Sequence, residues 1–180
     1  MEFWNGRRKR NFWKGAAAGA IGGLVAAWTM NQFQALWSKA SEAVESTTPR
    51  KSNGRARQEE GENATVKTAE LITEKFAGRR LRASEKEKAG ALLHYGFGTL
   101  VGALYGATAE YVPQTKVGWG VPYGAAVFVG ADEIAVPAFG LSKSPTEYPV
   151  SQHAYALASH IVYGATLETV RRIVRAKLLR

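Results

Sequence analysis

Four long stretches of this sequence are apolar and almost free of charge, and they constrain the fold more than any other feature. They cover residues 15–37, 89–112, 117–141 and 151–170. A helix needs roughly 20 apolar residues to cross the hydrocarbon core of a bilayer, and none of these stretches has the polar face of a surface helix. We therefore predict an all-α integral membrane protein, a four-helix bundle. The alternative is a soluble all-helical protein with buried helices.

Charge is concentrated outside these stretches. The chain of 180 residues carries 24 Lys and Arg against 15 Asp and Glu, and its length suits one domain. Residues 1–14 and 171–180 are basic, so both are predicted to lie in the cytoplasm. Anionic lipid headgroups explain this charge, and no nucleic-acid partner is predicted. Cysteine is absent, which excludes disulfides and thiolate chemistry.

The first stretch has an alternative interpretation as a cleaved signal peptide. Residues 7–10 would be its basic leading region, and Ser38-Lys39-Ala40 would be the cleavage site.

The polar loop over residues 38–88 has two parts. Residues 41–63 contain few large apolar side chains, which predicts disorder. Apolar residues at helical spacing over about residues 65–80 predict an amphipathic helix, either lying on the headgroups or solvated. A capping box at Ser84–Glu87 would start the second span, and one at Ser144–Glu147 predicts a short helix before the fourth.

The sequence contains an internal repeat. Residues 105–112 and 163–170 match at six of eight positions with an offset of 58, and Gly19-xxx-Gly23 parallels Gly120-xxx-Gly124 with an offset of 101. These matches predict two helical hairpins that form a parallel pseudo-repeat. The alternative is chance similarity between Gly- and Ala-rich helices.

Glycines spaced by four residues predict how the helices pack. Small residues on one face let two helix backbones approach closely in lipid. The predicted packing positions, a glycine zipper, are Gly98, Gly102 and Gly106 in the second span and Gly120 and Gly124 in the third. Pro122 lies near the start of the third span, and Pro137 near its end is expected to stop the helix.

Eight polar residues fall at membrane depth and form the candidate site. Ionisable residues inside a span cost a few kcal/mol, so they suggest function. One layer, toward the outer leaflet, would hold Asn31, His94, Asp132, Glu133 and His153. A second layer, near the cytoplasmic face, would hold Glu110 and Glu168, and His160 would lie between the two layers.

Several chemistries suit this set. Histidine and buried carboxylates can relay protons or ions. His94 and His153 with Asp132 or Glu133 could ligate a metal, and two facing histidines could ligate haem. The structural alternative is pairing across helices, with Glu110 and Glu168 bonded to the basic helix ends. No nucleophile elbow, phosphate loop or dinucleotide motif occurs, so neither an enzyme nor a cofactor is predicted.

The second half of the chain resembles the YagU-like inner-membrane family, a group with a domain of unknown function. The resemblance covers about residues 89–176 and rests on the run from Asp132 to Ser142, Tyr148-Pro149, Ser159–Tyr163, Glu168 and Arg171-Arg172. The family pattern falls on Pro137, Gly140, Leu141, His160, Glu168, Arg171 and Arg172. The pair Asp132-Glu133 departs from it. The resemblance implies a multi-span protein of a bacterial inner membrane that is associated with acid resistance, and it names no reaction.

Taken together, these observations predict support of acid tolerance or proton handling through intramembrane histidine and carboxylate groups. The alternatives are a structural accessory subunit of a larger membrane complex or homo-oligomer, and a cofactor-binding bundle. The lipid bilayer and its anionic headgroups are the expected partners.

Overall fold

The computed structural model describes residues 10–45 and 53–178, and this part of the chain is helical throughout, with short turns and no strand. The all-α prediction is therefore confirmed for it. In chain order the elements are α1 (Phe12–Glu45), α2 (Asn53–Ala77), α3 (Ala83–Tyr111), the 3-10 helix η1 (Pro113–Gly120), α4 (Val121–Val127), the π-helix η2 (Phe128–Ala135), α5 (Val136–Ala138), the 3-10 turn η3 (Pro145–Glu147) and α6 (Val150–Lys177).

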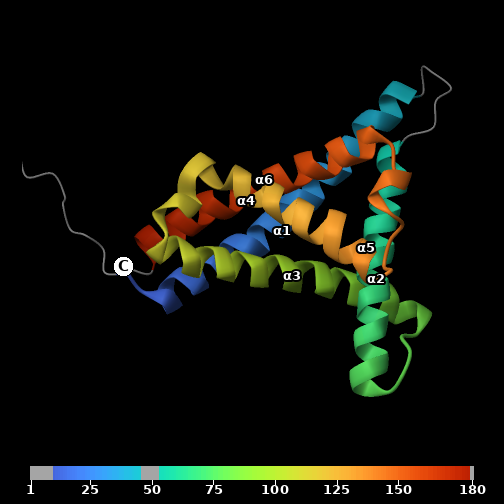
Figure 1. The fold of residues 1–180 in the computed structure, drawn as a ribbon, viewed down its shortest axis with the longest axis horizontal. Helices are drawn as coiled ribbons and strands as arrows, with labels where there is room; N and C mark the ends of the chain where they lie inside the picture. The colour runs from blue at the N-terminus through green and yellow to red at the C-terminus, as the bar shows by residue number, and fades with distance from the viewer. Residues whose placement is uncertain (1–9, 46–52, 179–180) are drawn as a thin grey trace, which may run out of the picture.

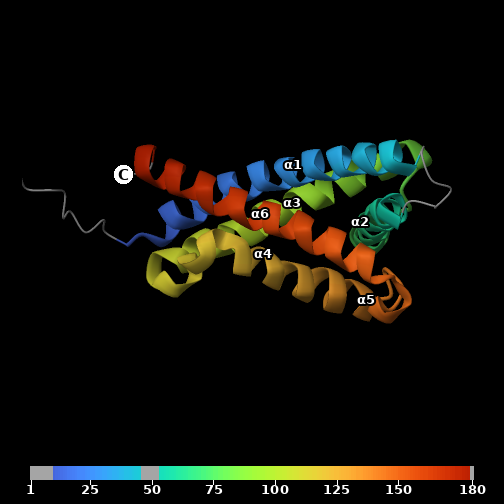
Figure 2. The same ribbon diagram turned by 90° about the horizontal axis from the view of Figure 1, so that it is seen from above.

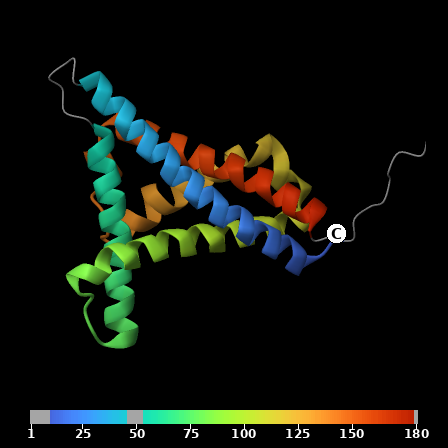
Figure 3. The ribbon, with the colours of Figure 1, turned by 180° about the vertical axis from the view of Figure 1, so that it is seen from behind.

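The helices form a bundle with one crosswise member. Helices α1, α3 and α6 and the α4–η2–α5 segment extend along the long direction of the molecule, whereas α2 crosses one end (Figure 1). The view from above shows α6 between α1 and the α4–α5 segment (Figure 2), and the view from behind shows α2 crossing α3 near the start of α3 (Figure 3). Within the described residues, no helix combines enough length with enough apolar character to qualify as a membrane span.

Glycines bring the backbones of α1 and α3 into direct contact. A Cβ atom added at Gly102 would lie 2.5 Å from the Gly19 carbonyl oxygen and 2.6 Å from Gly23 Cα. Gly106 faces Gly15 and Gly19 one turn further along. The interface thus has no room for side chains at these positions, and its contact is backbone against backbone.

The same arrangement joins α4 to α6. Gly120 lies against the carbonyl of Gly164, and Gly124 against the carbonyl of His160. Each predicted hairpin therefore has its own glycine contact, at matching positions of the repeat.

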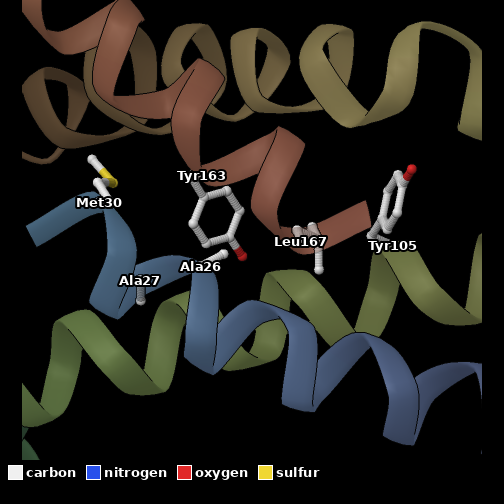
Figure 4. Packing of buried hydrophobic residues seen from close by; sticks show 6 residues of the cluster. All are labelled: Ala26, Ala27, Met30, Tyr105, Tyr163 and Leu167. Atoms are coloured by element: carbon white, nitrogen blue, oxygen red, sulfur yellow. The ribbon is translucent and has the colours of Figure 1, made fainter. Parts of the chain in front are cut away.

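Tyrosines and small apolar residues fill the space where the hairpins meet. The core cluster consists of Ala26, Ala27, Met30, Tyr105, Tyr163 and Leu167. Figure 4 shows the Tyr163 ring pointing from α6 toward α1 and α3, and its hydroxyl donates to the Gly98 carbonyl at 2.6 Å. This bond satisfies a polar group that would otherwise be costly to bury.

The third helix is shorter than the predicted stretch of residues 117–141. It starts at Val121 and ends at Ala138. The three residues before it have positive φ values of 70° at Gly118, 55° at Trp119 and 80° at Gly120, so the chain turns there. The prolines behave as expected, with Pro122 in the first turn and Pro137 in the last.

The prediction of disorder over residues 41–63 is wrong for the described part. Residues 41–45 continue α1 and residues 53–63 begin α2, while residues 46–52 lie outside the described residues. Residues 41–45 contain Glu and Ala, and residues 53–63 contain Arg, Ala, Gln and Glu, all of which favour helix even without an apolar face. The predicted amphipathic helix at 65–80 is therefore the second half of a longer helix that ends at Ala77.

The predicted capping box at Ser84–Glu87 is also wrong, because α3 begins earlier. Glu85 accepts a hydrogen bond from the Arg82 N–H at 2.8 Å and two from the Arg79 guanidinium at 2.8 and 3.2 Å. The bonds from Arg79 are the main reason that the pKa of Glu85 falls to about 2. The box at Ser144–Glu147 is confirmed, with the Ser144 N–H 3.1 Å from the Glu147 carboxylate.

Replacing Gly102 by Ala should destabilise the protein, because the new methyl group would overlap the α1 backbone. Overpacking of this kind lowers the free energy of unfolding by about 1–3 kcal/mol. Gly96→Ala is the matched control, since a Cβ atom there meets nothing within 4 Å. Thermal unfolding in detergent, followed by circular dichroism, should show a lower Tm for G102A only. Equal Tm values for the two variants would contradict the contact.

Candidate functional site

A π-helical segment positions the two carboxylates of the candidate site. Asp132 and Glu133 lie in η2, between α4 and α5, and both face α6 closely enough to meet its histidines. A π-helix departs from the regular hydrogen-bond pattern of an α-helix and occurs often at functional sites. Here it lets two consecutive acidic residues reach two histidines that are seven residues apart.

The first pair is Glu133 with His153. The Nδ1 atom of His153 lies 2.9 Å from Glu133 Oε1, and its Nε2 atom lies 3.0 Å from the carbonyl oxygen of Pro145. Both side chains are largely buried, at 17% exposure for Glu133 and 27% for His153. Since Pro145 belongs to η3, the short turn before α6 fixes one side of the imidazole.

The second pair is Asp132 with His160. The Nε2 atom of His160 lies 3.9 Å from Asp132 Oδ2, and its Nδ1 atom lies 2.9 Å from the Ala156 carbonyl oxygen one turn earlier in α6. His160 is buried and its ring packs beside Phe128 of η2. The imidazole therefore sits between its own helix backbone and a carboxylate.

His94 comes to the second pair from α3. It interacts electrostatically with His160 and Asp132, and it hydrogen-bonds to the Ala27 backbone. Its Nε2 atom is buried and has no hydrogen-bond partner among the described residues. The structure thus brings together His94, Asp132 and His160, with Glu133 and His153 beside them.

Asn31 does not join this group. Its side-chain amide donates to the Tyr95 hydroxyl at 3.1 Å, linking α1 to α3. Its contribution is a hydrogen bond between two neutral side chains, one on α1 and one on α3.

Glu168 and Glu110 form a separate buried network at the other end of α6. Glu168 is fully buried and accepts two bonds from Arg171, at 2.6 and 2.9 Å, and one from Arg172 at 2.5 Å. Glu110 accepts two from Arg175, at 2.7 and 3.0 Å, and one from the Asn11 N–H at 3.1 Å. The expected pairing of these acids with the basic helix ends is present.

Two features of this end were not anticipated from the sequence. Arg171 and Arg175 are each only 5% exposed, although they were expected to face lipid headgroups. Arg172 makes a cation–π contact with Trp119, and its guanidinium carbon lies 3.9 Å from the centre of the Trp119 ring. The three- and four-residue spacing of Arg171 and Arg172 after Glu168 is the signal that predicts such pairs.

The metal alternative gains no support from this geometry. Among the described residues, no group of three or more His, Asp or Glu side chains is arranged to hold a metal ion. The close acid–histidine contacts are pairs, Glu133 with His153 and Asp132 with His160.

Comparison with known proteins gives one result. Residues 46–169 match the family model described as "Protein of unknown function (DUF1440)". Searches of curated proteins and of solved structures found no significant match. The matched region includes α2, α3, the π-helix and most of α6, and it covers more than half of the sequence. The chain therefore belongs to this family of proteins of unknown function.

Proposed function

We propose that this protein is an integral membrane bundle whose two carboxylate–imidazole pairs bind and transfer protons, in support of acid tolerance. The membrane is taken to be a bacterial inner membrane, with both chain ends in the cytoplasm. This setting agrees with the resemblance to the YagU-like family. The geometry of His153 carries the proton-binding part of the proposal.

The distribution of apolar and polar residues supports the placement in lipid. Large apolar side chains lie on the outside, with exposures of 78% for Trp13, 75% for Leu92 and 82% for Val150, while Glu168 and Arg171 are buried. Soluble proteins show the reverse arrangement. Glycine and alanine lower the mean hydropathy of the long helices, but many of them face neighbouring helices rather than the surroundings.

Both ring nitrogens of His153 face groups that accept hydrogen bonds. The Pro145 carbonyl only accepts, so Nε2 must carry a hydrogen. The Glu133 carboxylate then bonds to Nδ1 only if a second proton lies between them, on the ring or on the acid. This geometry supports a pair that shares a proton, because without one the ring nitrogen and the carboxylate would be two acceptors 2.9 Å apart.

His160 has the complementary arrangement. Its Nδ1 atom faces the Ala156 carbonyl and so carries the hydrogen, which leaves the Nε2 lone pair directed toward Asp132. The gap of 3.9 Å exceeds a direct hydrogen bond. His160 is thus placed to accept a proton, while His153 is placed to hold one, and the two lie on the same face of α6.

The two histidines should show different ring protonation. In protein labelled with ¹⁵N in the histidine rings, Nε2 of His153 and Nδ1 of His160 are expected to carry hydrogen at neutral pH. Solid-state NMR in lipid distinguishes the two nitrogens by chemical shift, with His153→Asn and His160→Asn providing the assignments. A His160 signal from the Nε2–H form alone would contradict the proposed direction of its lone pair.

The protein should stay in the membrane fraction when peripheral proteins are removed. We expect it to resist sodium carbonate at high pH and to be released by a mild detergent, because its outer surface is apolar. Reporter fusions at both ends should be active in the cytoplasm. Release by carbonate, or fusions that report opposite sides, would overturn the membrane part of the proposal.

Proton movement should depend on both pairs. Liposomes containing the protein and a pH-sensitive dye should acidify faster than empty liposomes after an external drop in pH. Asp132→Asn and Glu133→Gln should each reduce this rate to that of empty liposomes, because an amide cannot take part in the shared proton. Glu87→Gln, at an exposed position near the start of α3, is the control. Unchanged rates in both pair variants would show that the pairs serve only to attach η2 to α6.

A further inference from the structure

An open cavity of about 590 Å³ lies beside α2, at the end of the bundle away from the Glu168 network. Its walls come from α2, from the turn after α2, from the start of α3 and from the segment after α5. This volume is within the range of small-molecule binding sites. Neither the family match nor the proton pairs assign it a role.

The charged wall of the cavity carries both signs. Glu70 of α2 pairs with Lys86 of α3 at 2.8 Å, and Glu74 of α2 lies 3.7 Å from the Arg80 guanidinium. All four side chains remain open to the surroundings, with exposures between 32% and 84%. A ligand can therefore reach them. Lys67 of α2 also lines the cavity, so its charged residues are three bases and two acids.

The remaining wall is apolar and also open. Leu71 is 55% exposed and Phe139 is 76% exposed, and both line the cavity beside the charged groups. This cavity has charges of both signs on one side and exposed apolar side chains on the other. Such a lining fits an amphiphile better than a fully polar molecule.

We propose that this cavity binds the headgroup of a zwitterionic phospholipid with a primary amine, that is, a phosphoethanolamine lipid. Arg80 and Lys86 bind the phosphate, Glu70 and Glu74 bind the ammonium group, and the first acyl carbons cover Leu71 and Phe139. The position of α2 across the end of the bundle places the cavity at headgroup depth, so this assignment rests on the membrane placement proposed above.

The carboxylates determine which headgroup fits. A primary ammonium donates three hydrogen bonds, whereas the trimethylammonium of a choline lipid donates none. A glycerol headgroup has no ammonium group, so it leaves Glu70 and Glu74 without a cationic donor. The two acids therefore select ethanolamine over both alternatives.

Competition between lipids tests this assignment. The full chain in maltoside micelles is given equal amounts of phosphatidylethanolamine, phosphatidylcholine and phosphatidylglycerol with identical acyl chains, and native mass spectrometry measures which lipid stays bound. We expect phosphatidylethanolamine to be retained about tenfold more than the choline lipid, the gain expected from one charge-assisted hydrogen bond. Equal retention, or preference for phosphatidylglycerol, would overturn the proposal.

Two variants assign the preference to the cavity. The double variant Glu70→Gln with Glu74→Gln should lose the selection for ethanolamine, and Arg80→Met with Lys86→Met should reduce retention of all three lipids. Glu87→Gln, which does not line the cavity, should behave as the unchanged protein. Selection that persists in the Glu variant would contradict the role of the acids, and circular dichroism verifies that each variant is folded.

Free phosphoethanolamine separates a lipid from a soluble ligand. If it displaces the lipid at equal concentration, the apolar wall contributes nothing and the lipid assignment is wrong. Failure of the membrane placement is recognised independently by carbonate extraction. A protein that resists carbonate but shows no headgroup selection would refute the cavity proposal alone.

Discussion

Backbone contact between helices at glycine is the interaction on which the rest of this structure depends. Gly102 and Gly106 meet Gly15, Gly19 and Gly23 with no side chain between them, and Gly124 lies directly against the His160 carbonyl. The second of these contacts sets the distance between the α4–η2 segment and α6. The carboxylates of η2 can reach the α6 histidines only because this distance is so short.

The close contacts also explain which residues are buried. With little space between the helices, the interior takes alanine, glycine and tyrosine, and the larger aliphatic side chains point outward. The charged groups that remain inside are paired, as Glu168 is with Arg171 and Glu110 with Arg175. A buried charge without a partner is costly, so removing one member of such a pair is far more damaging than replacing both.

The sequence predicts the long helices and their glycine faces well, because these depend on regular patterns over many residues. It predicts the ends poorly. Two left-handed glycines around Trp119 delay the start of the third helix, and a cap at Arg82 and Glu85 replaces the expected one at Ser84. We find no signal for the π-helix in the sequence. Because it rotates Asp132 and Glu133 relative to an α-helix, the actual acid–histidine pairs could not be derived from spacing alone.

The two hairpins differ at the positions where the second one carries its acid–histidine pairs. The repeat aligns Asn31 with Asp132, Tyr95 with His153 and Gly102 with His160. Where the first hairpin forms the bond between Asn31 and Tyr95, the second has His153 against Glu133, one residue beyond the counterpart of Asn31. One half of the molecule thus has a contact between two neutral side chains, while the other half has contacts between an acid and an imidazole. The acid–imidazole contacts thus belong to the second hairpin, and His94 of α3 is where the first hairpin meets them.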